Sequence, residues 1–251
     1  MNQEIHWDNI APTYDDEVFD VFKSDKNKIL ARYFKKHANK NNIATDFGCG
    51  TGKSFPYLAP SFKHIQALDI SAECINIARQ LEFTNISYKR ADLTQSTVKI
   101  PPAHFGLCCN VAILPKPEDN LNIIKTVHRG LRKNGSAIFV VPSMESMLFS
   151  SWRLMDWYKK EDVSPDKIPV HEFNYFNVDK TDLIQGIIDI NGVRTKHYTA
   201  SELHVLFNEA GLTITNKKKL EYDWSTEFNT PPSWLKAPYP WDWMIECKRL
   251  A

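Results

Sequence analysis

The chain has 251 residues and a formal net charge of +1, from 31 basic and 30 acidic side chains. A hydrophobic fraction of 43% and a charged fraction of 24% are typical of a soluble globular protein with a proper core. The near-neutral charge provides no strong field for a polyanion, which disfavours nucleic acid as the main partner.

The first residues, MNQEIHWDNIAPTYDD, are polar and acidic and contain neither an apolar signal core nor an arginine-rich transit pattern. No apolar run approaches the ~20 residues that a membrane helix requires, so we expect no membrane partner. The cysteines form an odd set without CxxC spacing, which predicts free thiols in a cytoplasmic protein and no metal site. They are Cys49, Cys74, Cys108, Cys109 and Cys247.

Periodicity predicts a helix or helix pair over 5–22 and a second helix over 25–40, followed by strands that alternate with helices. This alternation predicts right-handed βαβ crossovers and a doubly wound, mostly parallel α/β sheet with helices on both faces. The helix over 119–133 is expected to end at Gly135 as a left-handed cap. The expected strands are 42–47, 64–70, 85–89, 104–112 and 136–142, and the other helices are 53–60 and 72–82.

After Pro142 the alternation stops for an insertion, residues 143–198. Asn191-Gly192 predicts a type I′ hairpin within it, and the TASE sequence that begins at Thr199 predicts a capping box at the start of a helix. Two further strands, 212–222 and about 243–249, flank a tryptophan-rich segment, the aromatic loop (residues 222–243). The whole chain, 1–251, is expected to be one domain.

The stretch DFGCGTGKS carries three alternating glycines, Gly48, Gly50 and Gly52, after the first predicted strand. A triphosphate-binding loop would need glycine at Phe47, and a dinucleotide fingerprint would need glycine or alanine at Lys53. Both motifs are therefore excluded. What remains is a tight turn that a ligand can approach closely, before a helix start whose free N–H groups suit a carboxylate or a phosphate.

Two carboxylates follow at the ends of the next two strands. Asp69, in ALDIS, can accept hydrogen bonds from both hydroxyls of a ribose. Asp92, in RADL, can accept from an adenine amino group while Ile70 and Leu93 sandwich the ring. Each residue alone could equally be a cap or a turn residue.

At these spacings the sequence resembles the class I S-adenosylmethionine-dependent methyltransferase family. DFGCGTGKS resembles its glycine motif, ALDIS its ribose motif and RADL its adenine motif. HFGLCCNVAIL and LRKNGSAIFVVPS resemble its fourth and fifth strands, and WDNIAPTYDD resembles the start of a lid, here 1–24. The resemblance implies a Rossmann-like seven-stranded sheet with the last strand antiparallel.

The resemblance also implies the cofactor, S-adenosylmethionine, its product S-adenosylhomocysteine, and the residues that bind it. Asp46 would orient the loop or reach the cofactor's amino group, and the Gly48–Gly52 backbone, Cys49 included, would lie against the methionine and ribose. Asn110 would line the floor beside the sulfonium, and Tyr14 would contact the cofactor from the lid. Lys53 departs from the small or apolar residue often found at that place.

The acceptor should bind beyond the carboxyl ends of the parallel strands, where the lid, the insertion and the aromatic loop converge. The aromatic loop could form a wall for a flat or cationic molecule, or it could simply pack on the sheet edge. The candidates for a general base are His171, His197 and Glu145 in the insertion and His6 in the lid. After the fourth strand the chain reads Asn110-Val111-Ala112-Ile113 and lacks the motif of nucleic-acid amine methylases, which favours a small-molecule O, N or S acceptor.

Two other functions remain open. An aminopropyl transferase on the same fold would need an acidic cluster for a polyamine, and the sequence shows none. A non-catalytic binding module would not need intact glycines and carboxylates. We expect a monomer or a homodimer with no nucleic-acid partner.

Overall fold

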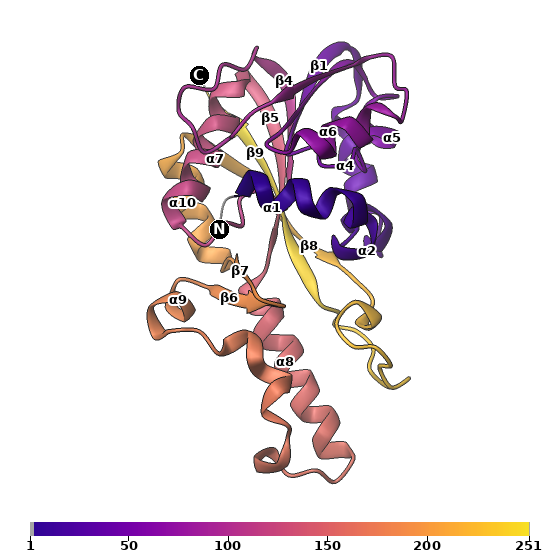
Figure 1. The fold of residues 1–251 in the computed structure, drawn as a ribbon, viewed down its shortest axis with the longest axis vertical. Coiled ribbons are helices and arrows are strands. Elements are labelled where there is room, and N and C mark those ends of the chain that lie inside the picture. The colour runs from indigo at the N-terminus through magenta and orange to yellow at the C-terminus, as the bar shows by residue number, and fades with distance from the viewer. Residues whose placement is uncertain (1–2, 251) are drawn as a thin grey trace.

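The structure, a computed structural model, describes residues 3–250, apart from the side chain of residue 16. Within this part, seven strands form one sheet in the order β3-β2-β1-β4-β5-β9-β8 (Figure 1). The first five pair in parallel, and β9 pairs antiparallel with both β5 and β8. The predicted fold class is confirmed, including the antiparallel last strand. The bounds are β1 Asn39–Phe47, β2 Phe62–Asp69, β3 Ile86–Arg90, β4 Ala103–Cys109, β5 Leu131–Pro142, β8 Leu212–Glu221 and β9 Trp241–Arg249.

Helices cover both faces of the sheet because apolar side chains alternate along the central strands. One face packs on α4 and α5 through Leu30, Phe34 and Leu58, and the other packs on α7 and α10. Cys108 and Cys109 point to opposite faces, as expected for neighbours in a strand. These helices are α4 Ile29–His37, α5 Phe55–Leu58, α6 Ala72–Arg79, α7 Pro117–Gly130 and α10 Ala200–Glu209.

Local sequence signals fix two of the connections. Asn191 and Gly192 have φ angles of 52° and 83°, as a type I′ turn requires, and join β6 (Ile187–Ile190) to β7 (Val193–Lys196). Thr199 caps α10 in a reciprocal capping box with Glu202. Both predictions are confirmed.

The predicted cap at Gly135 is wrong. Helix α7 ends at Gly130, and Leu131 already has an extended backbone and begins β5. The left-handed residue is Asn134, with a φ angle of 64°, in a stretch where the register between β4 and β5 shifts. Asparagine tolerates this conformation, so a strand irregularity absorbs the turn that we assigned to a helix end.

The segment before α4, predicted as a helix or helix pair over 5–22, is a series of short helices: α1 (Gln3–Ile10), η1 (Ala11–Thr13), α2 (Tyr14–Glu17) and α3 (Val21–Ser24). It crosses the carboxyl edge of the sheet (Figure 1). The first two residues of the predicted lid, 1–24, lie outside the described part.

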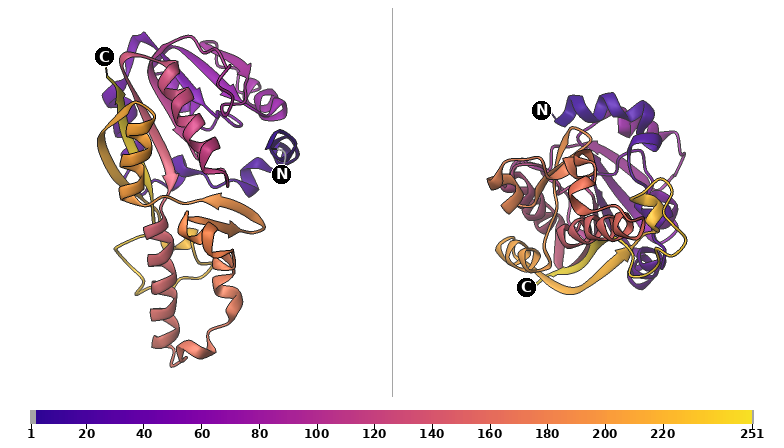
Figure 2. Two further views of the ribbon diagram at one scale, coloured as in Figure 1. Left: turned by 90° about the vertical axis from the view of Figure 1, so that its left-hand side faces the viewer. Right: turned by 90° about the horizontal axis from the view of Figure 1, so that it is seen from below.

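The insertion projects beyond the same edge (Figures 1 and 2). Strand β5 leads directly into α8 (Met144–Lys160), whose first turn is capped by the Ser143 hydroxyl, which accepts from Ser146 N–H at 3.0 Å. The aromatic loop lies against this helix, with the rings of Phe149 and Trp224 5.8 Å apart. The remaining elements are η2 Pro165–Lys167, η3 Val170–Phe176, α9 Lys180–Ile184 and η4 Trp224–Thr226. No helix within residues 3–250 is both long and apolar enough to cross a lipid bilayer.

Candidate active site

The loop after β1 has backbone torsions that exclude most residues other than glycine. The φ angles of Gly48, Gly50 and Gly52 are 81°, 49° and 90°. A Cβ atom at Gly48 would overlap the side chain of Val111, and one at Gly50 would overlap the phenol of Tyr14. The loop is therefore a bare backbone surface on which other groups lie closely.

The amide groups of this loop are already engaged. Those of Gly48 and Cys49 both donate to the Leu68 carbonyl at 2.8 Å, and that of Gly52 donates to Cys49 at 2.9 Å. Helix α5 is a single turn, which gives only a weak N-terminal dipole. The amides of Gly48 and Cys49 thus fasten the loop to β2.

Asp69, the last residue of β2, lies against the glycine loop. Its carboxylate accepts hydrogen bonds from Gly50 N–H at 2.7 Å and from Ser71 N–H at 2.9 Å. Burial raises the pKa of Asp69, and these backbone donors partly offset that effect. Asp69 therefore fastens the loop to the start of α6.

Asp46 lies beneath the loop near the end of β1 and is 2% exposed. It accepts a hydrogen bond from the Ser54 hydroxyl, and burial raises its pKa to about 7. This contact holds the far end of the loop. Cys49 is buried, and burial raises the pKa of its thiol well above the usual value, so it is no nucleophile.

Tyr14 brings the N-terminal segment onto the loop. Its ring lies 6.2 Å from that of Trp7 in α1. Asp8, next to Trp7 in α1, accepts a hydrogen bond from the Ser71 hydroxyl at 2.6 Å. Burial, with the charge of Asp69, raises the pKa of Tyr14 well above its usual value. The phenol stays neutral and can donate a hydrogen bond.

Lys53 tethers this segment, a role that its place in the motif does not reveal. Its ammonium lies 3.2 Å from the Asp15 carboxylate, donates to the Val18 carbonyl at 3.2 Å, and stands 5.1 Å from the centre of the Tyr14 ring. The lysine, which stands where the family pattern often has a small or apolar residue, thus connects the N-terminal segment to the end of the glycine loop. This contact is visible only in the structure, because Lys53 and Asp15 are distant in the sequence.

Asp92 uses its carboxylate in a local turn. It accepts from Thr94 N–H at 2.9 Å, from the Thr94 hydroxyl at 2.7 Å and from the Gln95 amide at 3.1 Å. Leu93 is buried in the core, and Ile70 is half-buried. These contacts are those of a turn residue, the alternative that the sequence left open.

Asn110 directly follows β4 with a φ angle of 54°. Its side-chain oxygen is buried and has no hydrogen-bond partner within residues 3–250. A buried amide oxygen without a donor is costly. A ligand beside the loop could supply the missing donor.

The candidate base Glu145 is engaged in the fold. One carboxylate oxygen accepts from Ala200 N–H at 2.6 Å and the other from the Trp243 indole at 3.2 Å. Glu145 thereby fastens α8 to α10 and β9. To act as a base it would have to break one of these contacts.

The two candidate histidines of the insertion differ in burial. His197 is 6% exposed, and burial lowers its pKa to about 4, so it stays neutral near pH 7. His171 lies exposed in η3. No hydrogen bond or ion pair in the described part of the chain brings either histidine to Glu145.

The chemical groups around the glycine loop are of the types that S-adenosylmethionine requires. A carboxylate beside a backbone without side chains suits a ribose diol, and the unpartnered oxygen of Asn110 suits a polar hydrogen. The phenol of Tyr14 also lies on this loop, beside Gly50.

Residues 45–139 match the family described as Methyltransferase domain. No curated protein matches the sequence of the chain. Solved structures of similar fold include an S-adenosylmethionine-dependent methyltransferase from Methanosarcina mazei, with a TM-score of 0.62 and 16% identity over 87% of this chain and 97% of that one. They also include the DhpI-SAM-HEP complex, with a TM-score of 0.60 and 15% identity over 98% and 95% of the two chains.

A third structure of similar fold is a putative methyltransferase of Haloferax volcanii in complex with the Trm112 methyltransferase activator, with a TM-score of 0.61 and 11% identity over 100% and 99% of the two chains. At these identities the structures show the shared fold. Residues 45–139 thus match a methyltransferase domain, on a fold that these structures share.

Proposed function

We propose that this protein transfers a methyl group from S-adenosylmethionine to an oxygen, nitrogen or sulfur atom of a small molecule. The observation that carries the proposal is the contact of Asp69 with Gly50 at 2.7 Å, which places a carboxylate on a loop that no side chain can fill. The cofactor supplies a methyl group already activated by a sulfonium. The chain has to bind both molecules and align them.

In this proposal Asp69 binds the ribose hydroxyls, and Asp46 keeps the loop in shape through Ser54. Asn110 lines the floor beside the sulfonium. This role is supported by its buried side-chain oxygen, which has no hydrogen-bond partner within residues 3–250. Tyr14 covers the bound cofactor from the N-terminal segment. Asp92, with Ile70 and Leu93, binds the adenine once it gives up part of its local turn contacts.

A small acceptor is supported by what surrounds the carboxyl edge. The N-terminal segment, the insertion and the aromatic loop all lie around this edge (Figure 1). An enclosed site favours methyl transfer by holding the nucleophile in line with the methyl group and by keeping water out. One structure of similar fold is the DhpI-SAM-HEP complex.

A base is needed only for an acceptor that carries a proton on its reacting atom. Of the candidates in the insertion, Glu145 is bound at both oxygens and His197 is buried, whereas the His171 side chain forms no hydrogen bond or ion pair within residues 3–250. We therefore retain His171 as the base. It lies in η3 of the insertion, and η3 would have to approach the glycine loop for this role.

The test is a methyl-transfer screen with isotope-labelled S-adenosylmethionine against pooled small metabolites, tRNA and unfolded protein. We expect label in the small-molecule fraction only, read by mass spectrometry. Label found only in nucleic acid or protein would contradict the proposed acceptor class. A Gly48→Ala variant, deficient in cofactor binding, is the control for transfer by contaminants.

A further inference from the structure

Helix α8 carries a row of exposed apolar side chains along one side. Leu148, Trp152 and Met155 are 52%, 57% and 41% exposed, whereas Ser150 and Leu154 of the same helix are buried. Successive spacings of four and three residues place the exposed three on one helix face. We call this row the α8 stripe. Large apolar side chains that lie together at a surface are typical of an interaction site.

Trp152, at the centre of the stripe, is held in place although it is exposed. Its ring stacks on that of Phe149 at a centroid distance of 6.2 Å, and the Arg153 guanidinium lies 5.8 Å from the indole. An ordered tryptophan loses little conformational freedom when a partner covers it, and tryptophan is enriched among the residues that dominate binding energy. Trp152 therefore has the properties of an interface anchor.

Two charged residues extend the stripe at its ends. Glu145 precedes Leu148 by three residues, and Lys159 follows Met155 by four. Positions 145, 148, 152, 155 and 159 thus follow the alternating spacing of three and four residues that paired helices use. Glu145 is half-buried and accepts hydrogen bonds from neutral donors, and Lys159 is exposed. Neither residue forms an ion pair within residues 3–250.

The stripe is complementary to itself in the antiparallel direction. Glu145 and Lys159 lie seven residues before and after Trp152, and Leu148 and Met155 lie four before and three after it. A two-fold axis at Trp152 therefore brings Leu148 of one protomer to Met155 of its partner, and Glu145 to Lys159. A parallel pair would instead place like charges together at both ends, which electrostatic repulsion disfavours.

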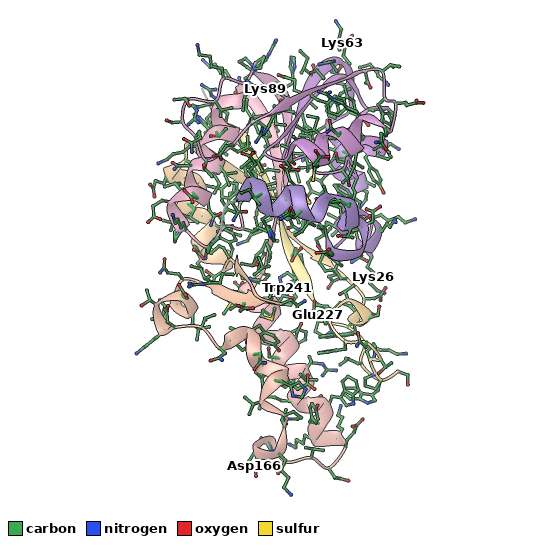
Figure 3. All side chains as sticks on the ribbon, in the orientation of Figure 1. Lys26, Lys63, Lys89, Asp166, Glu227 and Trp241 are labelled. Atoms are coloured by element: carbon green, nitrogen blue, oxygen red, sulfur yellow. The ribbon has the colours of Figure 1, made fainter. Side chains whose placement is uncertain are left out.

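The shape of the molecule leaves room for this pairing. Helix α8 projects beyond the carboxyl edge of the sheet (Figures 1 and 2). Asp166, in η2 after the end of α8, lies at the opposite end of the molecule from Lys63 in β2 (Figure 3). With 17 residues, α8 is about 25 Å long. In an antiparallel pair each domain lies beyond the tip of its partner's α8, so the two domains are kept apart.

We propose that the α8 stripe is a dimer interface, on which a second copy of this chain packs its own α8 in the antiparallel direction, with Trp152 at the two-fold axis. The apolar centre supplies the contact, and two pairs of Glu145 with Lys159 fix the direction. The seam spans only about two heptads, so we expect a dissociation constant in the micromolar range. The inference is independent of the proposed methyl transfer.

Sedimentation velocity over about 1 to 500 µM protein tests the dimer. We expect the wild-type protein to change from monomer to dimer across this range. Trp152→Ala should raise the dissociation constant at least about thirtyfold, because the symmetry removes two anchors. Lys159→Glu should raise it at least about fivefold, since both end pairs become repulsive.

Val205→Ala, which shortens a 67% exposed valine on α10, is the matched control and should leave the dissociation constant unchanged. All the replaced side chains are exposed, so the variants should fold, and circular dichroism checks this. A wild-type protein that stays monomeric over the whole range would overturn the inference. So would a dimer that Trp152→Ala does not weaken, because its interface would lie elsewhere.

Disulfide trapping tests the direction of the pairing while it keeps Trp152. A Leu148→Cys protein is mixed with a Met155→Cys protein, oxidised mildly and examined by mass spectrometry. An antiparallel pair predicts that the mixed disulfide predominates, whereas predominance of the two self-disulfides would contradict it. Oxidised wild-type protein is the control for the native cysteines, of which only Cys109 is not fully buried.

Discussion

Replacing Asp69 by alanine is expected to weaken S-adenosylmethionine binding by more than about tenfold. The variant loses the carboxylate proposed to hold the ribose, and it leaves the Gly50 amide without its acceptor at 2.7 Å. Calorimetric titration of the wild-type and variant proteins measures the change. An unchanged affinity would remove Asp69 from the site.

Two further variants separate binding of the ligand from support of the loop. Asp69→Asn keeps an oxygen for Gly50 but loses the charge, so its affinity should lie between those of the wild type and the alanine variant. Asp92→Ala removes a carboxylate that accepts from Thr94 and Gln95 in the structure, so its effect should be smaller than that of Asp69→Ala. Circular dichroism shows whether each variant is folded.

Gly48→Ala is expected to lose measurable cofactor binding and to lower the free energy of unfolding by more than about 2 kcal/mol. A φ angle of 81° costs a residue with a Cβ atom about 1–2 kcal/mol, and here the new methyl group also overlaps Val111. Denaturant unfolding and calorimetry measure the two effects.

Gly192 is the matched control for the backbone cost. Its φ angle of 83° is nearly that of Gly48, but a Cβ atom there would have no neighbour within 4 Å. Gly192→Ala should therefore show the torsional cost alone. Val111→Ala added to Gly48→Ala should remove the overlap and recover part of the difference. Equal destabilisation by Gly48→Ala and Gly192→Ala would show that the loop is not closely packed.

The sheet and its order of elements could be predicted because each element carries its own signal. The capping box at Thr199 and the Asn191-Gly192 turn depend on neighbours within a few residues, and both formed as expected. Gly135 failed because the end of α7 depends on where β5 begins to pair with β4, at Leu131. That pairing is a contact between distant segments, which local patterns do not encode.

The same distinction between local sequence signals and contacts of distant segments applies to the site. The glycine loop and Asp69 follow from a strand end and a tight turn, so the motif places them together. The tether of Lys53 to Asp15 depends on how the N-terminal segment folds over the sheet. The ion-pair partner of a charged residue can be identified only when the positions of both chain segments in the fold are known.

The binding of S-adenosylmethionine by the wild-type protein tests the central claim most directly. Calorimetric titration with S-adenosylmethionine and, separately, with S-adenosylhomocysteine should show saturable binding of one molecule of either compound per chain. The two should compete for one site, since they share the nucleoside and the amino-acid chain. Absence of binding for both compounds would contradict the assignment of the glycine loop as the cofactor site.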